Sequence, residues 1–379
     1  MVTVGIALAA AFAFMAQLPA SHTPQSRERA VTNGSDTESQ TQLLNDDTGK
    51  APREPTASTR AASAGIPSVS EVVALPPVGT RAHRKEWVRA RFGEAHDELG
   101  FFELPRGVDG EDRTPQSLVP TPDGRLLVLD SEKKRLVWYS EDGTLEDTRA
   151  IPQLVKPMDV GVSDDGTIVV MDAQGLHTKG TLILNADGSQ RGMLPQVPEP
   201  IAQMDVIGDS VYGLSGQGTV KLGTLDGTPS HETPGLYDQD GNIPGVVTSD
   251  GATVVNVLMR RKQKGVILVT ALRGEPPQHL YSRQFQVPLD GKLIGVPLVQ
   301  TDYRGTLYAA VVDDSWDQVL VCLELETGTP LGVVQVPWGD DPPYAFTFRR
   351  MNVDRKNGGV VTQRFTKDGG VIYERFDCR

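Results

Sequence analysis

The stretch Thr121–Thr144, TPDGRLLVLDSEKKRLVWYSEDGT, places two short apolar runs between two Asp-Gly turns. Each run has the length of one β-strand and is too short for a helix. A single hairpin of this size is only marginally stable in water. The stretch therefore predicts a strand pair that is buried by further copies of itself elsewhere in the chain.

The first turn recurs at intervals that are typical of a β-propeller. Similar turns precede apolar runs at six positions, 42 to 54 residues apart, and a second series follows five of these runs. Glycine suits these places because hairpin turns need positive φ. A ring of such sheets buries the faces that one sheet leaves open, so we expect an all-β, six-bladed β-propeller. The turn glycines are Gly124, Gly166, Gly208, Gly251, Gly305 and Gly358, then Gly143, Gly188, Gly227, Gly274 and Gly328.

The sixth unit stops at Arg379 before its outermost strand, which leaves an open edge. The segment EWVRARFG near the start of the domain alternates, with Val88, Ala90 and Phe92 on one face. We predict that this segment closes the last blade. The alternative is a short amphipathic helix over residues 83–99.

The first part of the chain divides into two further segments. Val4 to Ala16 is an uncharged apolar run of thirteen residues, too short to span a bilayer comfortably. Residues 1–20 are interpreted as a secretory signal peptide, although no Lys or Arg precedes the apolar run; an uncleaved anchor or a misassigned start is the alternative. Residues 21–82 are rich in Ser, Thr, Ala and Pro and predict a disordered linker. The propeller would then occupy residues 83–379.

These features predict an exported protein that is periplasmic, on the cell surface or secreted. The net charge of −12 argues against binding to nucleic acid, which needs a basic face. A membrane is expected to be contacted only through an uncleaved N-terminal segment. Cys322 and Cys378 could form a disulfide in an oxidising compartment, or be two half-buried strand cysteines.

The segment FGEAHDELGFFELP, followed by SLVPTPDGRLLVLDSEKKRLVWYSEDGT, resembles NHL repeats of the exported bacterial type. The shared pattern is a strand that ends in apolar-x-Asp before the next hairpin, at Asp130 and Asp172. The other units carry Leu214, Val257, Val311 and Arg364 at the equal offset. The resemblance implies architecture more strongly than it implies function.

Six-bladed propellers of this kind include metal-dependent lactonases similar to gluconolactonase, in which inner strands bring oxygen ligands to a central divalent cation. The resemblance makes a lactonase-like hydrolase or lyase the alternative function. Speculative metal ligands are Asp159, Asp205 and Asn352, with calcium as the candidate ion. The complete ligand set of those enzymes is missing, so the preferred prediction has no cofactor.

The preferred function is non-catalytic binding or scaffolding. Loops between second and third strands share one face of a propeller with the loops between blades, and here that face carries the longest loops. The opposite face, with its short Asp-Gly turns, is expected to offer little. Aromatic and acidic side chains on the long loops suit a protein, glycan or small ligand of the cell envelope, unless the tryptophans merely pack a blade junction. The candidate binding residues are Asp314, Trp316, Trp338, Asp340, Asp341 and Tyr344.

Overall fold

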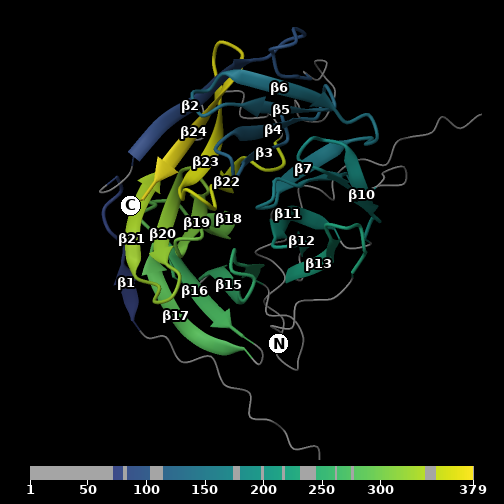
Figure 1. Ribbon diagram of the computed structural model, residues 1–379. Coiled ribbons are helices and arrows are strands. Elements are labelled where there is room, and N and C mark those ends of the chain that lie inside the picture. Colours follow the sequence, from purple (N-terminus) through teal and green to yellow (C-terminus); the bar gives the residue numbers. More distant parts are fainter. Residues whose placement is uncertain are drawn as a thin grey trace, which may run out of the picture.

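The computed structural model describes residues 71–79, 83–102, 114–173, 180–197, 200–215, 218–230, 245–260, 263–274, 277–337 and 347–378. Six sheets are arranged around a common centre (Figure 1), which confirms the predicted six-bladed β-propeller. Across these residues the chain forms strands and turns, and none of it is an apolar helix of membrane-spanning length. The predicted signal peptide and most of the predicted linker lie outside the described residues.

The first three blades follow one another along the chain, each running from an inner to an outer strand. Blade 1 contains β3 (Ser117–Pro120), β4 (Leu126–Asp130), β5 (Arg135–Tyr139) and β6 (Leu145–Ala150). Blade 2 contains β7 (Pro157–Val162), β8 (Ile168–Asp172), β9 (Thr181–Leu184) and β10 (Gln190–Leu194). Within the described residues blade 3 contains β11 (Ile201–Ile207), β12 (Ser210–Ser215) and β13 (Gly218–Thr224).

Two of the remaining blades also recruit strands from the N-terminal part of the chain. Blade 4 contains β14 (Val246–Val247), β15 (Thr253–Met259), β16 (Val266–Arg273), β17 (Gln278–Gln286) and β1 (Val72–Ala74). Blade 5 contains β18 (Leu293–Thr301), β19 (Thr306–Asp313), β20 (Gln318–Glu324) and β21 (Pro330–Gln335). Blade 6 contains β22 (Met351–Val353), β23 (Val360–Thr366), β24 (Gly370–Asp377) and β2 (His83–Arg91).

The turn glycines have the predicted backbone conformation, because all eleven have positive φ. Gly143 has a second reason to be glycine. A Cβ at this position would lie 2.3 Å from the carbonyl oxygen of Trp87 in β2. The turn of blade 1 can therefore approach the closing strand only without a side chain.

Several of these turns share a hydrogen-bonding pattern in which a hydroxyl two residues before an aspartate donates to its carboxylate. In blade 3 the Thr224 hydroxyl donates to Asp226 at 2.5 Å, and the Thr228 amide donates to the same carboxylate at 2.9 Å. These bonds favour the ionised form and lower the pKa of Asp226 to about 2. The turns thus depend on ionised carboxylates.

The closing strand is confirmed, and the helix alternative is wrong. β2 pairs antiparallel with β24, with Val88 opposite Tyr373, and completes blade 6. A strand is favoured over a helix there because Val88 and Ala90 are buried in the apolar cluster between blades 6 and 1.

The N-terminal segment is ordered earlier than residue 83, which corrects part of the predicted 21–82 linker. β1 lies parallel to β17 on the outer edge of blade 4, with Val72 opposite Gln284. The Gly79 amide then donates to the Val333 carbonyl of blade 5 at 2.8 Å. Residues 72–79 therefore lie along the outer edges of blades 4 and 5, and residues 83–91 along that of blade 6 (Figure 1).

The apolar core is divided into clusters between neighbouring blades. Twelve buried residues lie between blades 6 and 1, whereas only three described ones, Ile207, Val247 and Val254, form the separate cluster between blades 3 and 4. Between blades 5 and 6, Cys322 and Cys378 form a disulfide with a Cα–Cα distance of 6.3 Å.

The aspartates of the NHL-like pattern fix the connections that enter a blade. Asp130 accepts hydrogen bonds from the Gly100 amide and forms an ion pair with Arg135 at 2.9 Å. Asp172 accepts the amides of Val155 and Lys156. Their role in the structure is therefore to hold the backbone.

Candidate functional site

The inner strands bring a polar cluster to the centre of the ring. Asp159 of β7 is fully buried and accepts hydrogen bonds from the Ser117 hydroxyl at 2.6 Å and the Met204 amide at 2.8 Å. The guanidinium of Arg349, two residues before the start of β22, lies 2.9 Å from the Asp159 carboxylate. Burial raises the pKa of Asp159, and Arg349, Ser117 and the Met204 amide oppose that rise.

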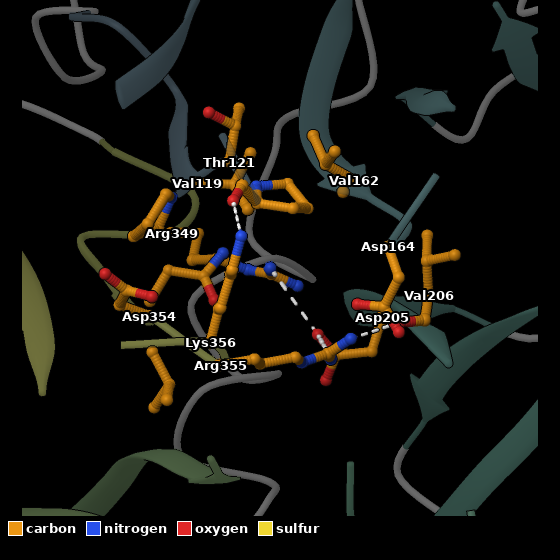
Figure 2. A pocket seen from close by; sticks show the side chains of 15 residues that line it. Val119, Thr121, Val162, Asp164, Asp205, Val206, Arg349, Asp354, Arg355 and Lys356 are labelled. Atoms are coloured by element: carbon orange, nitrogen blue, oxygen red, sulfur yellow. Dashed lines mark hydrogen bonds and ion pairs between the residues drawn. The ribbon is translucent and has the colours of Figure 1, made fainter. Parts of the chain in front are cut away.

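A second carboxylate, Asp205 of β11, collects contacts from three blades. Gln203 donates to it from the same strand at 3.1 Å, and Gln300 donates from β18 at 2.9 Å. Arg355 of blade 6 lies 3.1 Å away, and Arg349 lies 3.8 Å away. Figure 2 shows both arginines directed toward Asp205. The two arginines supply as many positive charges as Asp159 and Asp205 supply negative ones.

Several of these contacts cross the centre between opposite blades. Arg349 and Arg355 of blade 6 also donate to the carbonyls of Met204 and Val206 in blade 3. The Tyr303 hydroxyl of blade 5 donates to Asp164 of blade 2 at 2.6 Å. We call the contacts that Arg349, Arg355 and Gln300 make with β11 the spokes. Together with the Tyr303–Asp164 bond they brace the ring across its centre.

The central pocket is small because these side chains fill it. Its cavity volume is about 30 Å³, enough for about one or two water molecules. Sites for organic ligands are typically about 300–1,000 Å³. The centre of the ring is therefore a braced polar core and has no room for an organic substrate.

The three speculative metal ligands do not form a site that fits a divalent cation. Asp159 uses both oxygens for Ser117, Met204 and Arg349, and Asp205 is shared by two glutamines and two arginines. The Asn352 amide group donates to the Leu118 carbonyl at 2.9 Å. Among the described residues no group of three or more His, Cys, Asp or Glu side chains could hold a metal.

The face that carries the loops between blades and between second and third strands is called the loop face here. On it, Trp316 lies in a tightly held turn between β19 and β20. Its side chain is 55% exposed, and its backbone has a φ of +64°, a conformation that is rare and costly for a bulky residue. Asp313 holds the turn by accepting the amides of Gly291, Ser315 and Asp317 at 2.9 to 3.0 Å. Asp314 adds a hydrogen bond from the Lys292 amide at 2.9 Å.

The structure thus places Asp314 and Trp316 on one braced turn, as the topology predicted. The other predicted binding residues, Trp338, Asp340, Asp341 and Tyr344, lie outside the described residues. Their proximity to Trp316 stays a prediction.

Sequence reasoning missed the arginines and Gln300. Counting seven residues back from the first turn glycine of blades 1 and 2 gives Ser117 and Asp159, which do meet, but the same count gives Ile201 and Leu298 in blades 3 and 5. In blade 3 the reason is the length of the turn: two residues separate the paired Ile207 and Ser210, against five between Val162 and Ile168 in blade 2, so the same count reaches further along the strand. The available signal was the pair Arg349–Arg350 beside an inner strand whose counterparts carry Asp159 and Asp205.

The Asp-Gly turn face carries more than short turns. The central pocket is lined by residues of the β3–β4 and β22–β23 turns, which both lie on that face. The turn after β22 carries two long cationic side chains, of which Arg355 reaches the opposite blade 3 and Lys356 reaches the neighbouring blade 1.

Comparison with protein families and with curated proteins gives no match. Among solved structures, the PQQ-bound aldose sugar dehydrogenase from Streptomyces coelicolor is 13% identical, with a TM-score of 0.43, over 80% of this chain and 100% of that one. The hydrazine synthase of Kuenenia stuttgartiensis is 13% identical, with a TM-score of 0.42, over 68% and 76%. A streptogramin B lyase is 12% identical, with a TM-score of 0.36, over 78% and 97%. Similarities this distant carry no argument about activity.

Proposed function

We propose that this chain is a non-catalytic binding propeller that acts outside the cytoplasm and recognises a protein or glycan through its loop face. The observation that carries the proposal is Trp316. A large aromatic side chain is exposed on a turn whose backbone would be relaxed by glycine. Exposed aromatic anchors on rigid turns are typical of recognition sites.

The central site favours binding over the lactonase-like alternative. A catalytic divalent cation needs oxygen ligands that converge on one point. Here Arg349 lies beside Asp159, at the place where such ligands would be required, and the carboxylate oxygens are already engaged. A location outside the cytoplasm is supported by the disulfide, since structural disulfides persist in oxidising compartments.

The proposal is tested by separating the stability of the Trp316 turn from its recognition. Trp316→Ala keeps a Cβ at positive φ, whereas Trp316→Gly removes it. We expect Trp316→Gly to be more stable than Trp316→Ala by about 1 kcal/mol, measured from urea unfolding midpoints. We also expect both variants to lose binding to the partner.

Partner binding is measured with a photo-crosslinker placed at Ser315, beside the tryptophan, in a cell-envelope extract. The matched control carries the crosslinker at Ala186, an exposed residue on the opposite face. The proposal predicts a product at Ser315 that disappears with Trp316→Gly and is missing at Ala186. Identical products at both positions, or products that persist in both Trp316 variants, would contradict it.

A further inference from the structure

A groove between blades 6 and 1 opens on the Asp-Gly turn face, opposite Trp316. Its cavity volume is about 400 Å³, within the range of small-molecule sites. Blade 6 contributes residues of β2, β24 and the β22–β23 turn, and blade 1 contributes two turns. The lining side chains that matter below are Lys85, Trp87, Glu141, Lys356, Asn357 and Arg375.

The floor of this groove is held in place by contacts within the protein. Asp354 is buried, accepts the Asn357 amide at 2.8 Å and forms an ion pair with Arg375 at 3.2 Å. The indole N–H of Trp87 donates to the Ser140 carbonyl at 3.0 Å. The aromatic and guanidinium groups are thus fixed before any ligand arrives, which lowers the entropic cost of binding.

The charges that remain available are mainly positive. Asp354 is paired with Arg375, and Asp123, also in the lining, is paired with Arg125 at 2.6 Å. Lys356 donates one hydrogen bond to the Pro122 carbonyl at 2.8 Å, which leaves two of its N–H groups for a ligand. Lys85 and Glu141 have no ion pair within the described part of the chain. Two ammonium groups therefore face one carboxylate.

We propose that this groove binds a sugar that carries an anionic group, either a carboxylate or a phosphate. Lys85 and Lys356 would neutralise the anion through charge-assisted hydrogen bonds. The Trp87 indole and Pro122 offer apolar contact to the sugar ring, while Glu141 and Asn357 offer hydrogen bonds to its hydroxyls.

The test is calorimetric titration of the full chain with glucuronate, glucose 6-phosphate, glucose and inorganic phosphate, each to about 10 mM, a range that detects millimolar affinities. The proposal predicts saturable binding of at least one charged sugar, and at least tenfold weaker binding of glucose and of inorganic phosphate. Whichever of glucuronate and glucose 6-phosphate binds with the higher affinity shows whether the preferred anionic group is a carboxylate or a phosphate.

Variants localise the binding. Lys85→Gln should weaken it about tenfold, whereas Lys367→Gln, an exposed lysine on the opposite face, should leave it unchanged. Trp316→Gly should also leave it unchanged, which keeps this site distinguishable from the loop face. The proposal is overturned if no charged sugar binds, if glucose or inorganic phosphate binds as tightly, or if Lys85→Gln behaves like Lys367→Gln.

Discussion

The junction between blades 6 and 1 and the junction between blades 3 and 4 close the same ring by different means. The first buries twelve apolar residues, including Val88 and Ala90 from the closing strand. The second has, within the described residues, a separate cluster of only Ile207, Val247 and Val254. Apolar burial is the main stabilising term in most folds, so the second junction needs another source of stability.

The spokes stabilise blade 3 in another way, by joining it to blades 5 and 6 across the centre and not to blade 4. Blade 3 receives Arg349 and Arg355 from blade 6 and Gln300 from blade 5, and all of them reach β11. Removing one partner of a buried, hydrogen-bonded ion pair destabilises the fold strongly, because the other charge is left buried without compensation. The comparison teaches that polar contacts across the centre can hold a blade whose described apolar contacts with the next blade are few.

The largest expected effect concerns the closing strand. Expression without residues 1–91 removes β2 and exposes the edge of β24, and we expect loss of soluble folded protein. Expression without residues 1–79 removes β1 and the Gly79 contact, and should leave the propeller folded. Soluble yield and a cooperative thermal transition report the difference. Equal behaviour of the two truncations would show that the 6/1 junction does not depend on β2.

The next effect concerns Arg349, which makes spokes to β11 and also forms an ion pair with Asp159 of β7. Arg349→Met leaves Asp159 buried without its cation and should lower the free energy of unfolding by about 3–5 kcal/mol. Adding Asp159→Asn should restore a large part of that loss, because the uncompensated charge is gone. Urea unfolding midpoints measure both. A double variant no more stable than the single one would mean that the pair is not coupled.

A smaller effect compares the two apolar clusters directly. Val128 lies in the 6/1 cluster at 0% exposure, and Val254 lies in the 3/4 cluster at 5%. Val128→Ala should lower the free energy of unfolding by about 2 kcal/mol and Val254→Ala by about 1 kcal/mol, because the thinner cluster leaves a smaller cavity. Urea unfolding midpoints measure both changes. If the two costs are equal, the 3/4 junction is packed as well as the other.

The smallest effect is an acid dependence that both regions share. The pKa of Asp226 in blade 3 is lowered to about 2, and that of Asp142 in blade 1 is also lowered. Carboxylates of this kind stabilise the fold above their unfolded pKa of about 4 and lose that contribution as pH falls toward 2. Urea midpoints should therefore fall between pH 4 and pH 2. Asp226→Asn should make that fall shallower, and an unchanged pH profile in this variant would contradict the assignment.

The fold was predictable from the sequence because its signals are local. Positive φ at Gly124 or Gly143 follows from the hairpin turns themselves, and the closing strand follows from the alternation around Val88 and the edge that the last blade would otherwise leave open. The strand β1 was not predictable, because three residues beside a long edge carry no distinctive pattern.

The central site was predictable only in part. Asp159 and Ser117 lie at the expected offset from their turn glycines, but the shorter turn after β11 changes which residue of blade 3 that offset reaches. Arg349 and Arg355 act across the ring, so their partners are fixed by the closed fold and not by sequence spacing. The same holds for the groove at Lys85 and Lys356, which joins residues from the two ends of the domain.

The most direct test of the spokes is native-state hydrogen exchange of wild type and Asp205→Asn, compared segment by segment. Removing this charge leaves the shape of the side chain almost unchanged but weakens the contacts with Arg349, Arg355 and Gln300. The account predicts faster exchange concentrated in β11 to β15, with β2, β24 and β4 unchanged. Unchanged exchange in β11, or an equal increase at the junction of blades 6 and 1, would contradict it.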